Sequence, residues 1–439
     1  MFLWCVIYVA SLKSLGFAGI LAYTIPVLFL FNTSVSNIPL VLTMLLFTPG
    51  QALGIPSIFV MTAAFGMGFV LLKHGITPFY ELANRNPLFK AVLLFAFIAS
   101  FSLLWSKDIV IAGRYALEYI KGALFVALLL VVTRTRQDWE RLLISFAGFG
   151  ALVFVIGASH HYYGTDTALH IMMQGMPAGS DEWLNKTKLA AGADSVRLIW
   201  PGAEPNYLGS QLVFPFGVAV SLFVSATTTL RRCYATLCAL LVLLGIAGTY
   251  SRGSLVALSV FCLLFVLAMP RKIPLLSLFA ATTLCLAAYF TDNSFVERLN
   301  TIPDQAVNER ATGRYDRYGW AIDLWGKSPV WGCGLGAMDV EKGDAAHNSF
   351  LQVLAELGVV GFSVYLFIIV ITVREASLYV HRTSKTLNSK TGIILLIALL
   401  ATCVNYCTIS CYDPRILYLA LSVIWLYATV PGYERRVPL

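Results

Sequence analysis

The sequence carries little charge for its length. Only 12% of its 439 residues are Asp, Glu, Lys or Arg, about half the share found in soluble globular proteins, whereas 58% are hydrophobic. Water is therefore not the main solvent of this chain's surface. Apolar runs of about 17 to 25 residues recur along it, which is the length a helix needs to cross hydrocarbon, and the alternating segments of about ten residues typical of strand barrels are missing. The composition predicts an all-α, polytopic integral membrane protein.

The usual signatures of metal and cofactor sites are also missing. The sequence has no DxD pair, no HExxH motif and no glycine-rich phosphate loop. Its nine cysteines show no CxxC or Cys/His spacing. Cys403, Cys407 and Cys411 recur every fourth residue, so we expect them to pack as small apolar residues on one helix face. We predict a protein without metal or cofactor, in which any phosphate is bound by arginines.

The formal net charge of +8 comes from basic clusters in short loops. If the spans are counted one by one, these clusters fall on one side, as the positive-inside rule requires of the cytoplasmic face. The charge therefore indicates topology, with cytoplasmic N- and C-termini, and not a nucleic-acid partner. The clusters are Arg134, Arg136 and Arg141; Arg231 and Arg232; Arg271 and Lys272; Arg374, Arg382, Lys385 and Lys390; and Arg435 and Arg436.

The apolar runs predict about twelve transmembrane helices in a single domain over residues 1–439. The first ten residues lack the charged start and the cleavage site of a removable signal peptide. The expected spans lie near 14–31, 52–72, 88–105, 109–132, 139–158, 207–229, 233–250, 253–270, 273–291, 347–373, 391–411 and 415–431, with a shorter apolar piece near 38–48.

Two longer polar segments, 160–206 and 292–346, fall on the predicted periplasmic side. Segments of this length are usually functional. Within the second, residues 315–327 have the pattern of a short amphipathic helix that lies at the membrane surface. Ser328-Pro329 should end this helix, and three glycines between 332 and 336 predict a tight turn.

His347 stands at the start of the span that follows the second polar segment. Asn348 or Ser349 can cap this helix, which leaves the imidazole at its electropositive N-terminal end. That end disfavours imidazolium, so we expect a neutral ring able to accept a proton from a hydroxyl group. The alternative is an interfacial histidine that only solvates the end of the helix.

Arg252 lies between two apolar spans that are joined by almost no loop, on the side where few arginines are expected. A charge there costs a few kcal/mol unless it is paired or hydrated, which makes a function the default hypothesis. Its planar guanidinium matches the oxygens of a phosphate. The alternative is that the side chain extends to lipid headgroups.

Other arginines can contribute to the same anionic group. Arg197 precedes the span near 207, and Arg310, Arg314 and Arg317 lie in the second polar segment. The alternative for each is a salt bridge with the acidic residues of the loops.

A second group of charges lies inside a predicted span. Arg114, Glu118 and Lys121 share one helix face at increasing depth. Charges at that depth imply either the wall of a polar cavity, which we favour, or an internal ion pair. We expect Arg114, Lys121 and Asn348 to support the site.

Several of these pieces resemble the O-antigen ligase family in their order and spacing. His347-Asn348, followed nine residues later by Gly358-Val359-Val360-Gly361, is similar to that family's His-Asn-x9-Gly-x-x-Gly signature. Residues 313–336 look like its periplasmic loop. Similar pieces are found at Glu204-Pro205-Asn206 and Thr249-Tyr250-Ser251-Arg252-Gly253.

The resemblance implies an enzyme of the bacterial inner membrane with a periplasmic active site. Such enzymes transfer a glycan from undecaprenyl diphosphate to a sugar hydroxyl of the lipid A–core oligosaccharide, in lipopolysaccharide biosynthesis, by a metal-independent inverting mechanism. Carried onto this chain, His347 activates the acceptor hydroxyl, and Arg252 and Arg197 bind the diphosphate. Arg314 or Arg317 completes this clamp or holds phosphates of the acceptor.

Three alternatives stay open at this point. An O-antigen polymerase or a protein O-oligosaccharyltransferase uses the same donor with a different acceptor. A lipid-linked glycan flippase or exporter also needs a charged cavity, for which Arg114, Glu118 and Lys121 are the best support. That class predicts charge along the whole path and usually an internal repeat, and we find no repeat in the sequence.

Overall fold

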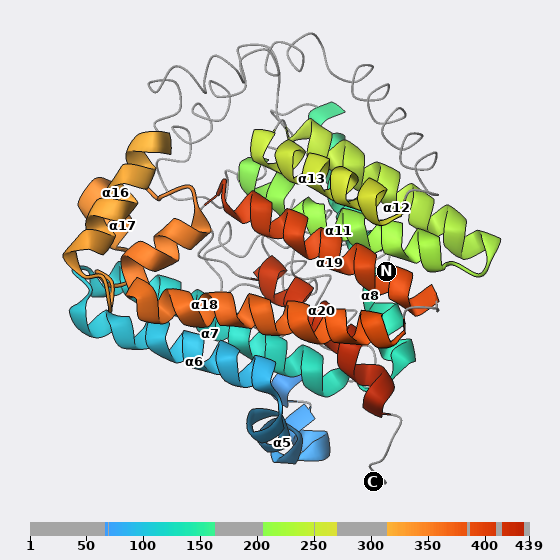
Figure 1. Cartoon of the computed structure of the whole chain (residues 1–439), viewed down its shortest axis with the longest axis horizontal. Helices are drawn as coiled ribbons and strands as arrows, with labels where there is room; N and C mark the ends of the chain where they lie inside the picture. Colours follow the sequence, from blue (N-terminus) through green and yellow to red (C-terminus); the bar gives the residue numbers. More distant parts are fainter. Residues whose placement is uncertain are drawn as a thin grey trace, which may run out of the picture.

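The computed structural model describes residues 66–68, 70–162, 205–249, 251–269, 314–383, 387–409 and 415–433 (Figure 1). Throughout these ranges the regular structure is helical, with no β-strand. The labelled helices are α5 (Thr77–Arg85), α6 (Pro87–Phe101), the 3-10 helix η2 (Ser102–Trp105), α7 (Ile109–Val132), α8 (Arg136–Tyr162), α11 (Pro205–Ser225), α12 (Thr229–Gly248), α13 (Arg252–Ala268), α16 (Arg314–Lys327), α17 (Ala337–Lys342), α18 (Ser349–Arg382), α19 (Leu387–Tyr406) and α20 (Arg415–Tyr433).

Six of the described helices are long and apolar enough to cross a membrane, and α13 and α20 are apolar but shorter. The prediction of a helical membrane protein is therefore confirmed. The total of about twelve spans stays a prediction, because the spans expected near 14–31 and 273–291 and most of that near 52–72 lie outside the described residues, as does the shorter apolar piece near 38–48. The six are Pro87–Trp105, Ile109–Val132, Asn206–Ser225, Thr229–Gly248, Ser349–Arg382 and Ser389–Tyr406.

Short polar side chains fix where several helices begin. The side chain of Asn86 accepts a hydrogen bond from the backbone N–H of Phe89 at 3.0 Å, at the start of α6. Asp108 and Thr228 cap α7 and α12 in the same way. Such caps satisfy N–H groups that the first helical turn leaves unpaired, so each helix begins next to its cap.

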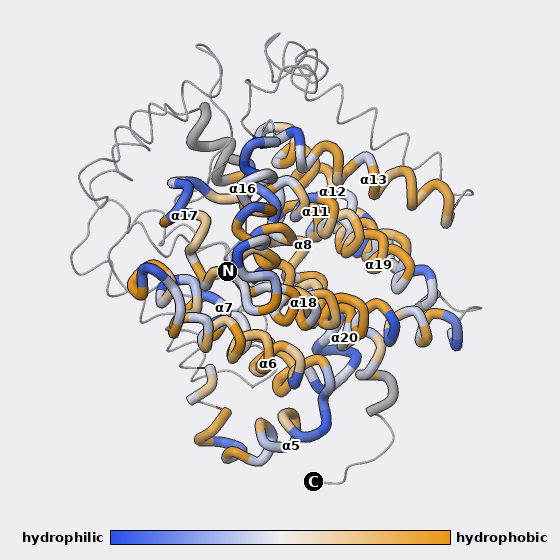
Figure 2. Tube along the Cα trace, turned by 60° about the vertical axis from the view of Figure 1, so that its left-hand side comes forward, coloured by the Kyte–Doolittle hydropathy of each residue, from blue (hydrophilic) through white to orange (hydrophobic). Residues whose placement is uncertain are grey.

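The bundle is built around α11, which packs against α8, α12, α13 and α19. The outer helices turn large apolar side chains outward, among them Phe97 on α6, Leu263 on α13 and Phe367 on α18. Figure 2 shows hydrophobic residues along the long helices, whereas hydrophilic residues gather at helix ends and on α16 and α17. This distribution suits a bundle whose outer surface meets hydrocarbon.

Helix ends that carry basic clusters meet at one end of this bundle. Arg231 at the start of α12 forms an ion pair with Glu140 at the start of α8, at 3.6 Å. The Arg136 guanidinium lies 5.8 Å from the ring of Tyr427 on α20, which in turn contacts Tyr379 near the end of α18 at 4.9 Å. That this end faces the cytoplasm stays a prediction of the positive-inside rule.

Candidate active site

The helices that carry the candidate residues meet at the C-terminal end of α19, away from the basic clusters. We call residues 405–409, the last residues of α19 and the turn behind it, the α19 turn. Within it the amide of Asn405 donates to the hydroxyl of Ser254 on α13 at 3.0 Å. A Cβ atom on Gly253 would overlap the Thr408 hydroxyl, so this close approach depends on glycine. Arg252, the half-buried first residue of α13, lies directly beside this contact.

Two further elements attach to the α19 turn through its backbone carbonyls. The hydroxyl of Tyr318 on α16 donates to the carbonyl of Cys407 at 3.3 Å. The buried hydroxyl of Ser349, the first residue of α18, donates to the carbonyl of Ile409 at 2.7 Å. The start of α13, the helix α16 and the start of α18 therefore converge on one short segment, about 30 Å along α19 from the basic end.

His347 precedes α18 in an unusual backbone conformation. Its φ of 51° makes it the one non-glycine residue with positive φ in the part of the chain that the structure describes. This conformation costs about 1–2 kcal/mol and persists only where surrounding contacts hold it. Asn348 next to it accepts hydrogen bonds from the N–H groups of Phe350 and Leu351 at 3.0 and 3.1 Å. Of the two candidate caps, Asn348 is thus the one that begins α18.

Asp344 links His347 to Arg317 of α16. One carboxylate oxygen accepts a hydrogen bond from the Arg317 guanidinium, and the other lies 3.9 Å from Nε2 of His347. The exposed fractions of the three side chains are 39% for Asp344, 23% for Arg317 and 28% for His347, so solvent reaches the group. The loop salt bridge considered as the alternative for Arg317 is present. We did not predict Asp344 as a site residue, and its position three residues before His347 was the available signal.

Arg314 lies one turn before Arg317 on α16 and is half-buried. No described residue forms a hydrogen bond or an ion pair with its side chain. Burial raises the pKa of the nearby Tyr318, and the charge of Arg314 opposes that rise. Arg314 thus adds a positive charge beside the α19 turn, to which Tyr318 is hydrogen-bonded.

Two buried side chains on α18 hold the backbone behind His347. Gln352 accepts a hydrogen bond from the N–H of Ala346 at 3.2 Å and donates one to Glu356 at 3.1 Å. The same Glu356 oxygen accepts from the N–H of Met338 on α17 at 3.4 Å. This chain of bonds fixes the residue directly before His347. Sequence reasoning missed it, because Gln352 and Glu356 lie inside a predicted span.

The Gly-x-x-Gly part of the sequence signature marks a break in α18. Gly358 has φ 65° and ψ −169° inside the helix. The opened turn pairs with residues 329–334 through four backbone hydrogen bonds of 2.9 to 3.2 Å, such as that from the N–H of Gly334 to the carbonyl of Glu356. A Cβ atom on Gly332 or on Gly358 would overlap the opposing backbone. The glycine turn predicted near 332–336 and the signature glycine thus form one contact.

The break also reverses the direction of the chain. The rings of Phe350 and Tyr365 are 5.6 Å apart, although a straight helix would separate residues fifteen positions apart by about 22 Å. The first part of α18, residues 349–357, therefore folds back against the second. This bend carries His347 back over the bundle, where Ser349 reaches the α19 turn.

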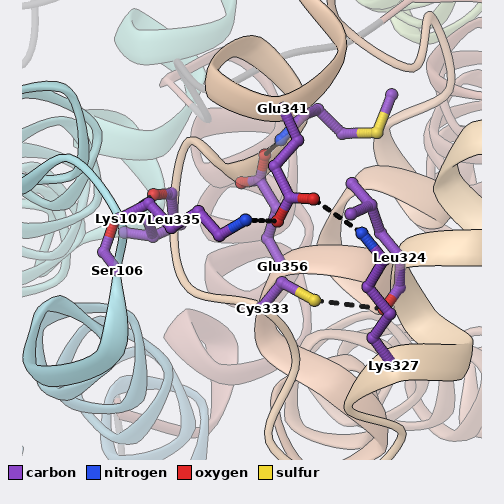
Figure 3. Close-up of polar contacts among 9 residues, drawn as sticks. Ser106, Lys107, Leu324, Lys327, Cys333, Leu335, Glu341 and Glu356 are labelled. Carbon is purple, nitrogen blue, oxygen red and sulfur yellow. Dashed lines mark hydrogen bonds and ion pairs between the residues drawn. The ribbon is translucent and has the colours of Figure 1, made fainter.

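The segment around α16 and α17 is also attached to the start of α7 (Figure 3). Glu341 of α17 lies between two lysines, with its oxygens 2.9 Å from Nζ of Lys107 and 2.6 Å from Nζ of Lys327. The hydrogen bonds from Lys327 and Lys107 hold the pKa of Glu341 below its ordinary range. Tyr115 of α7 donates to Asp339, whose pKa is raised by burial. The site is therefore fixed to the bundle on a second side.

α16 confirms the short helix predicted over residues 315–327. Its buried residues Ala321 and Leu324 pack against Met338 of α17 and Ala355 of α18. Tyr315 and Ile322 remain exposed on its outer side. The apolar face therefore packs on the protein itself.

The remaining predicted residues are not joined to this group by any described contact. Lys121 and Glu118 on α7 form an ion pair at 2.8 Å, which is the second of the two alternatives weighed for them. Arg114 is exposed and pairs with no described residue. The supporting role of Arg114 and Lys121 stays a prediction, and Arg197 lies outside the described residues. Within the described ranges, no group of three or more His, Cys, Asp or Glu side chains is placed to hold a metal ion.

Comparison with known proteins identifies the region that holds this geometry. No curated protein matches the chain. Residues 237–366 match the sequence model of a family described as O-antigen ligase, and the match includes Arg252, α16, the contact of Gly332 with Gly358, and His347. The match covers about three tenths of the chain and supports an O-antigen ligase-like family, in agreement with the resemblance seen in the sequence.

Proposed function

We propose that this protein is an O-antigen ligase. It transfers a glycan from undecaprenyl diphosphate to a sugar hydroxyl of lipid A–core oligosaccharide, at the periplasmic face of the bacterial inner membrane. The observation that carries this proposal is that the start of α18, the start of α13 and the helix α16 meet at the α19 turn. These elements carry His347, Arg252, and the pair Arg314 and Arg317. A base and several guanidinium groups at one end of a membrane bundle suit transfer from a lipid diphosphate.

In the proposed reaction His347 accepts the proton of the acceptor hydroxyl as that oxygen attacks the anomeric carbon of the donor. The new C–O bond forms on the face opposite the diphosphate, and the bond from the anomeric carbon to the diphosphate oxygen breaks. The electron pair leaves with undecaprenyl diphosphate, so the configuration at the anomeric carbon inverts. The proton on His347 then passes to solvent or to the departing diphosphate.

Arginines stabilise the charge that develops on the leaving diphosphate. Arg252 and Arg314 are proposed to hold its oxygens, with Arg197 and Arg317 completing the clamp. Preorganised charge of this kind acts where negative charge builds up in the transition state. Because guanidinium forks match phosphate oxygens in charge and in geometry, we propose that transfer needs no divalent metal.

The arrangement also suits the delivery of both substrates. Donor and acceptor are each anchored in lipid, so they can approach the same end of the bundle within one leaflet. An O-antigen polymerase or a protein O-oligosaccharyltransferase would use the same donor site and differ in its acceptor. The ion pair between Glu118 and Lys121 lets each charge compensate the other, which weakens the case for a charged export path along α7.

The test is transfer by purified full-length protein in the presence of EDTA. Undecaprenyl-diphosphate-linked glycan and lipid A–core serve as substrates for wild type and for His347→Ala. We expect product from wild type alone, with both proteins equally well folded. The matched control is His381→Ala, which removes an exposed histidine at the other end of α18 and should transfer normally.

Two results would change the proposal. Product from His347→Ala at the wild-type rate would exclude His347 as the base. If wild type formed product only with a lipid-linked glycan as acceptor, the protein would be a polymerase. If it formed product only with a protein acceptor, it would be a protein O-oligosaccharyltransferase.

A further inference from the structure

We propose that Asp344 exchanges partners when the donor binds, leaving Arg317 for His347, so that an occupied diphosphate site prepares the base. This inference rests on the proposed function, in which Arg317 belongs to the diphosphate clamp. It makes Asp344 a positioning residue that couples the donor site to the acceptor site.

The two oxygens of Asp344 already serve different partners. Oδ2 accepts from the guanidinium of Arg317, while Oδ1 accepts from the N–H of Ala345 at 2.8 Å and lies 3.9 Å from Nε2 of His347. The last distance suits an ion pair but is too long for a hydrogen bond. A small rotation of the carboxylate would therefore close the contact with His347 once Arg317 is withdrawn.

The Asp344 carboxylate also binds the guanidinium of Arg317, which a diphosphate would need. A diphosphate brings more negative charge than one carboxylate and can accept two parallel hydrogen bonds from an arginine. The pair between Asp344 and Arg317 is partly exposed, so solvent weakens it and little free energy opposes its opening. Donor binding should therefore displace Asp344 from Arg317.

The released carboxylate improves His347 as a base. A carboxylate close to Nε2 orients the ring and stabilises the imidazolium that forms when the other ring nitrogen takes the acceptor proton. Other charged groups around this pair are Arg314 on α16, Asp339 on α17 and Glu356 on α18, and the variants below leave them unchanged.

The exchange predicts that the pH profiles of free and donor-bound enzyme differ, which can be measured on wild type without any variant. The rate measured at saturating donor and low acceptor reports the donor-bound enzyme, whereas the rate at low concentrations of both reports the free enzyme. Because Asp344 favours imidazolium more strongly once it has left Arg317, the acid limb of the pH profile should lie at higher pH for the donor-bound enzyme. Coincident acid limbs would overturn the exchange.

Variants of Asp344 test the same coupling. In Asp344→Asn, donor binding measured directly on the purified protein should tighten about two- to fivefold, because Arg317 is freed from a partly exposed ion pair. Its kcat should fall about 10- to 100-fold, the size of effect known for the loss of a hydrogen-bonding partner that orients a metal-bound histidine. Its acid limb should move to lower pH. Asp344→Glu should recover much of kcat.

The matched control is Asp316→Asn, which neutralises an exposed carboxylate on α16 and should change none of these values. A fall of donor affinity and kcat by the same factor in Asp344→Asn would show a purely structural role and overturn the proposal. Absence of transfer by wild type, together with tighter donor binding by Asp344→Asn, would contradict the proposed function and still support competition for Arg317.

Discussion

Arg252 shows how one side chain depends on the residues around it. It begins α13 directly after Ser251, whose side chain accepts from the N–H of Ser254 at 3.4 Å. Ser254 is in turn bonded to Asn405 of the α19 turn, and Gly253 lies against Thr408. The backbone that carries Arg252 is therefore fixed, which is what a clamp for a diphosphate requires.

We predict that Arg252→Lys lowers kcat about 100-fold or more. Lysine keeps the positive charge but loses the planar fork that binds two phosphate oxygens at once. The measurement is steady-state transfer with the lipid-linked donor. Arg374→Lys, at an exposed arginine paired with Glu375, is the matched control and should transfer normally. Near-normal rates for Arg252→Lys would argue against the diphosphate clamp.

For single residues, the sequence predicted which residues begin a helix better than it predicted which side chains contact each other. His347 and its cap Asn348 follow from the pattern at the start of a span, because helix caps are local. Asp344 and Gln352 were not predicted, since their importance lies in contacts with Arg317 and with the backbone of Ala346. Such contacts depend on the bend in α18, which hydropathy does not encode.

α18 is the element on which the site depends most. Its first part, residues 349–357, packs against α16 and α17 and carries His347 at its start. Its second part packs against α6, α19 and α20 in the bundle. The backbone contact of Gly332 with Gly358 joins the two parts to the loop before them.

We predict that Gly358→Ala strongly destabilises this junction and removes transfer activity. Its φ and ψ lie in a region that is accessible to glycine alone and costs other residues about 1–3 kcal/mol, and the added Cβ would also overlap the carbonyl of Val330. Amide hydrogen exchange across residues 329–360 should rise. Gly326→Ala, at a helical glycine of α16 with open space around it, is the control and should be tolerated. Normal activity for Gly358→Ala would mean that the bend is dispensable.

A helix could be predicted from the sequence where an apolar run or a capping residue marks its ends. The helix over 315–327 and the spans near 88–105 and 109–132 are found close to where they were expected. The single span over 347–373 was predicted without its break, because an isolated glycine in an apolar run is also compatible with a straight helix. The structure shows instead two helical parts with opposed directions.

The whole molecule has two chemically different ends. Helix ends with basic clusters meet around Arg136, Glu140 and Tyr427, and the candidate site lies around the α19 turn. The positive-inside count predicted that these groups are separated by the bundle. The arrangement of helices around α11 was not predictable, because apolar helices of similar length carry little information about their neighbours.

We predict that the two ends are exposed on opposite sides of the membrane. In a background in which the nine native cysteines are replaced, Tyr315→Cys should react with an impermeant maleimide added to intact spheroplasts. Arg382→Cys, at the other end of α18, should react only after the membrane is permeabilised. Labelling of both in intact spheroplasts, or the reverse order, would contradict a periplasmic site.

The bend at Gly358 also sets the height of the chemistry above the lipid. The part of α18 beyond the bend has about 24 residues and is about 36 Å long, enough to cross the hydrocarbon core of about 30 Å without the first part. The first part has only nine residues, is about 14 Å long and folds back against the second, so His347 stays within about 15 Å of the bend. A lipid-linked donor would need to raise only its diphosphate and first sugar out of the bilayer, while its hydrocarbon chain stays dissolved.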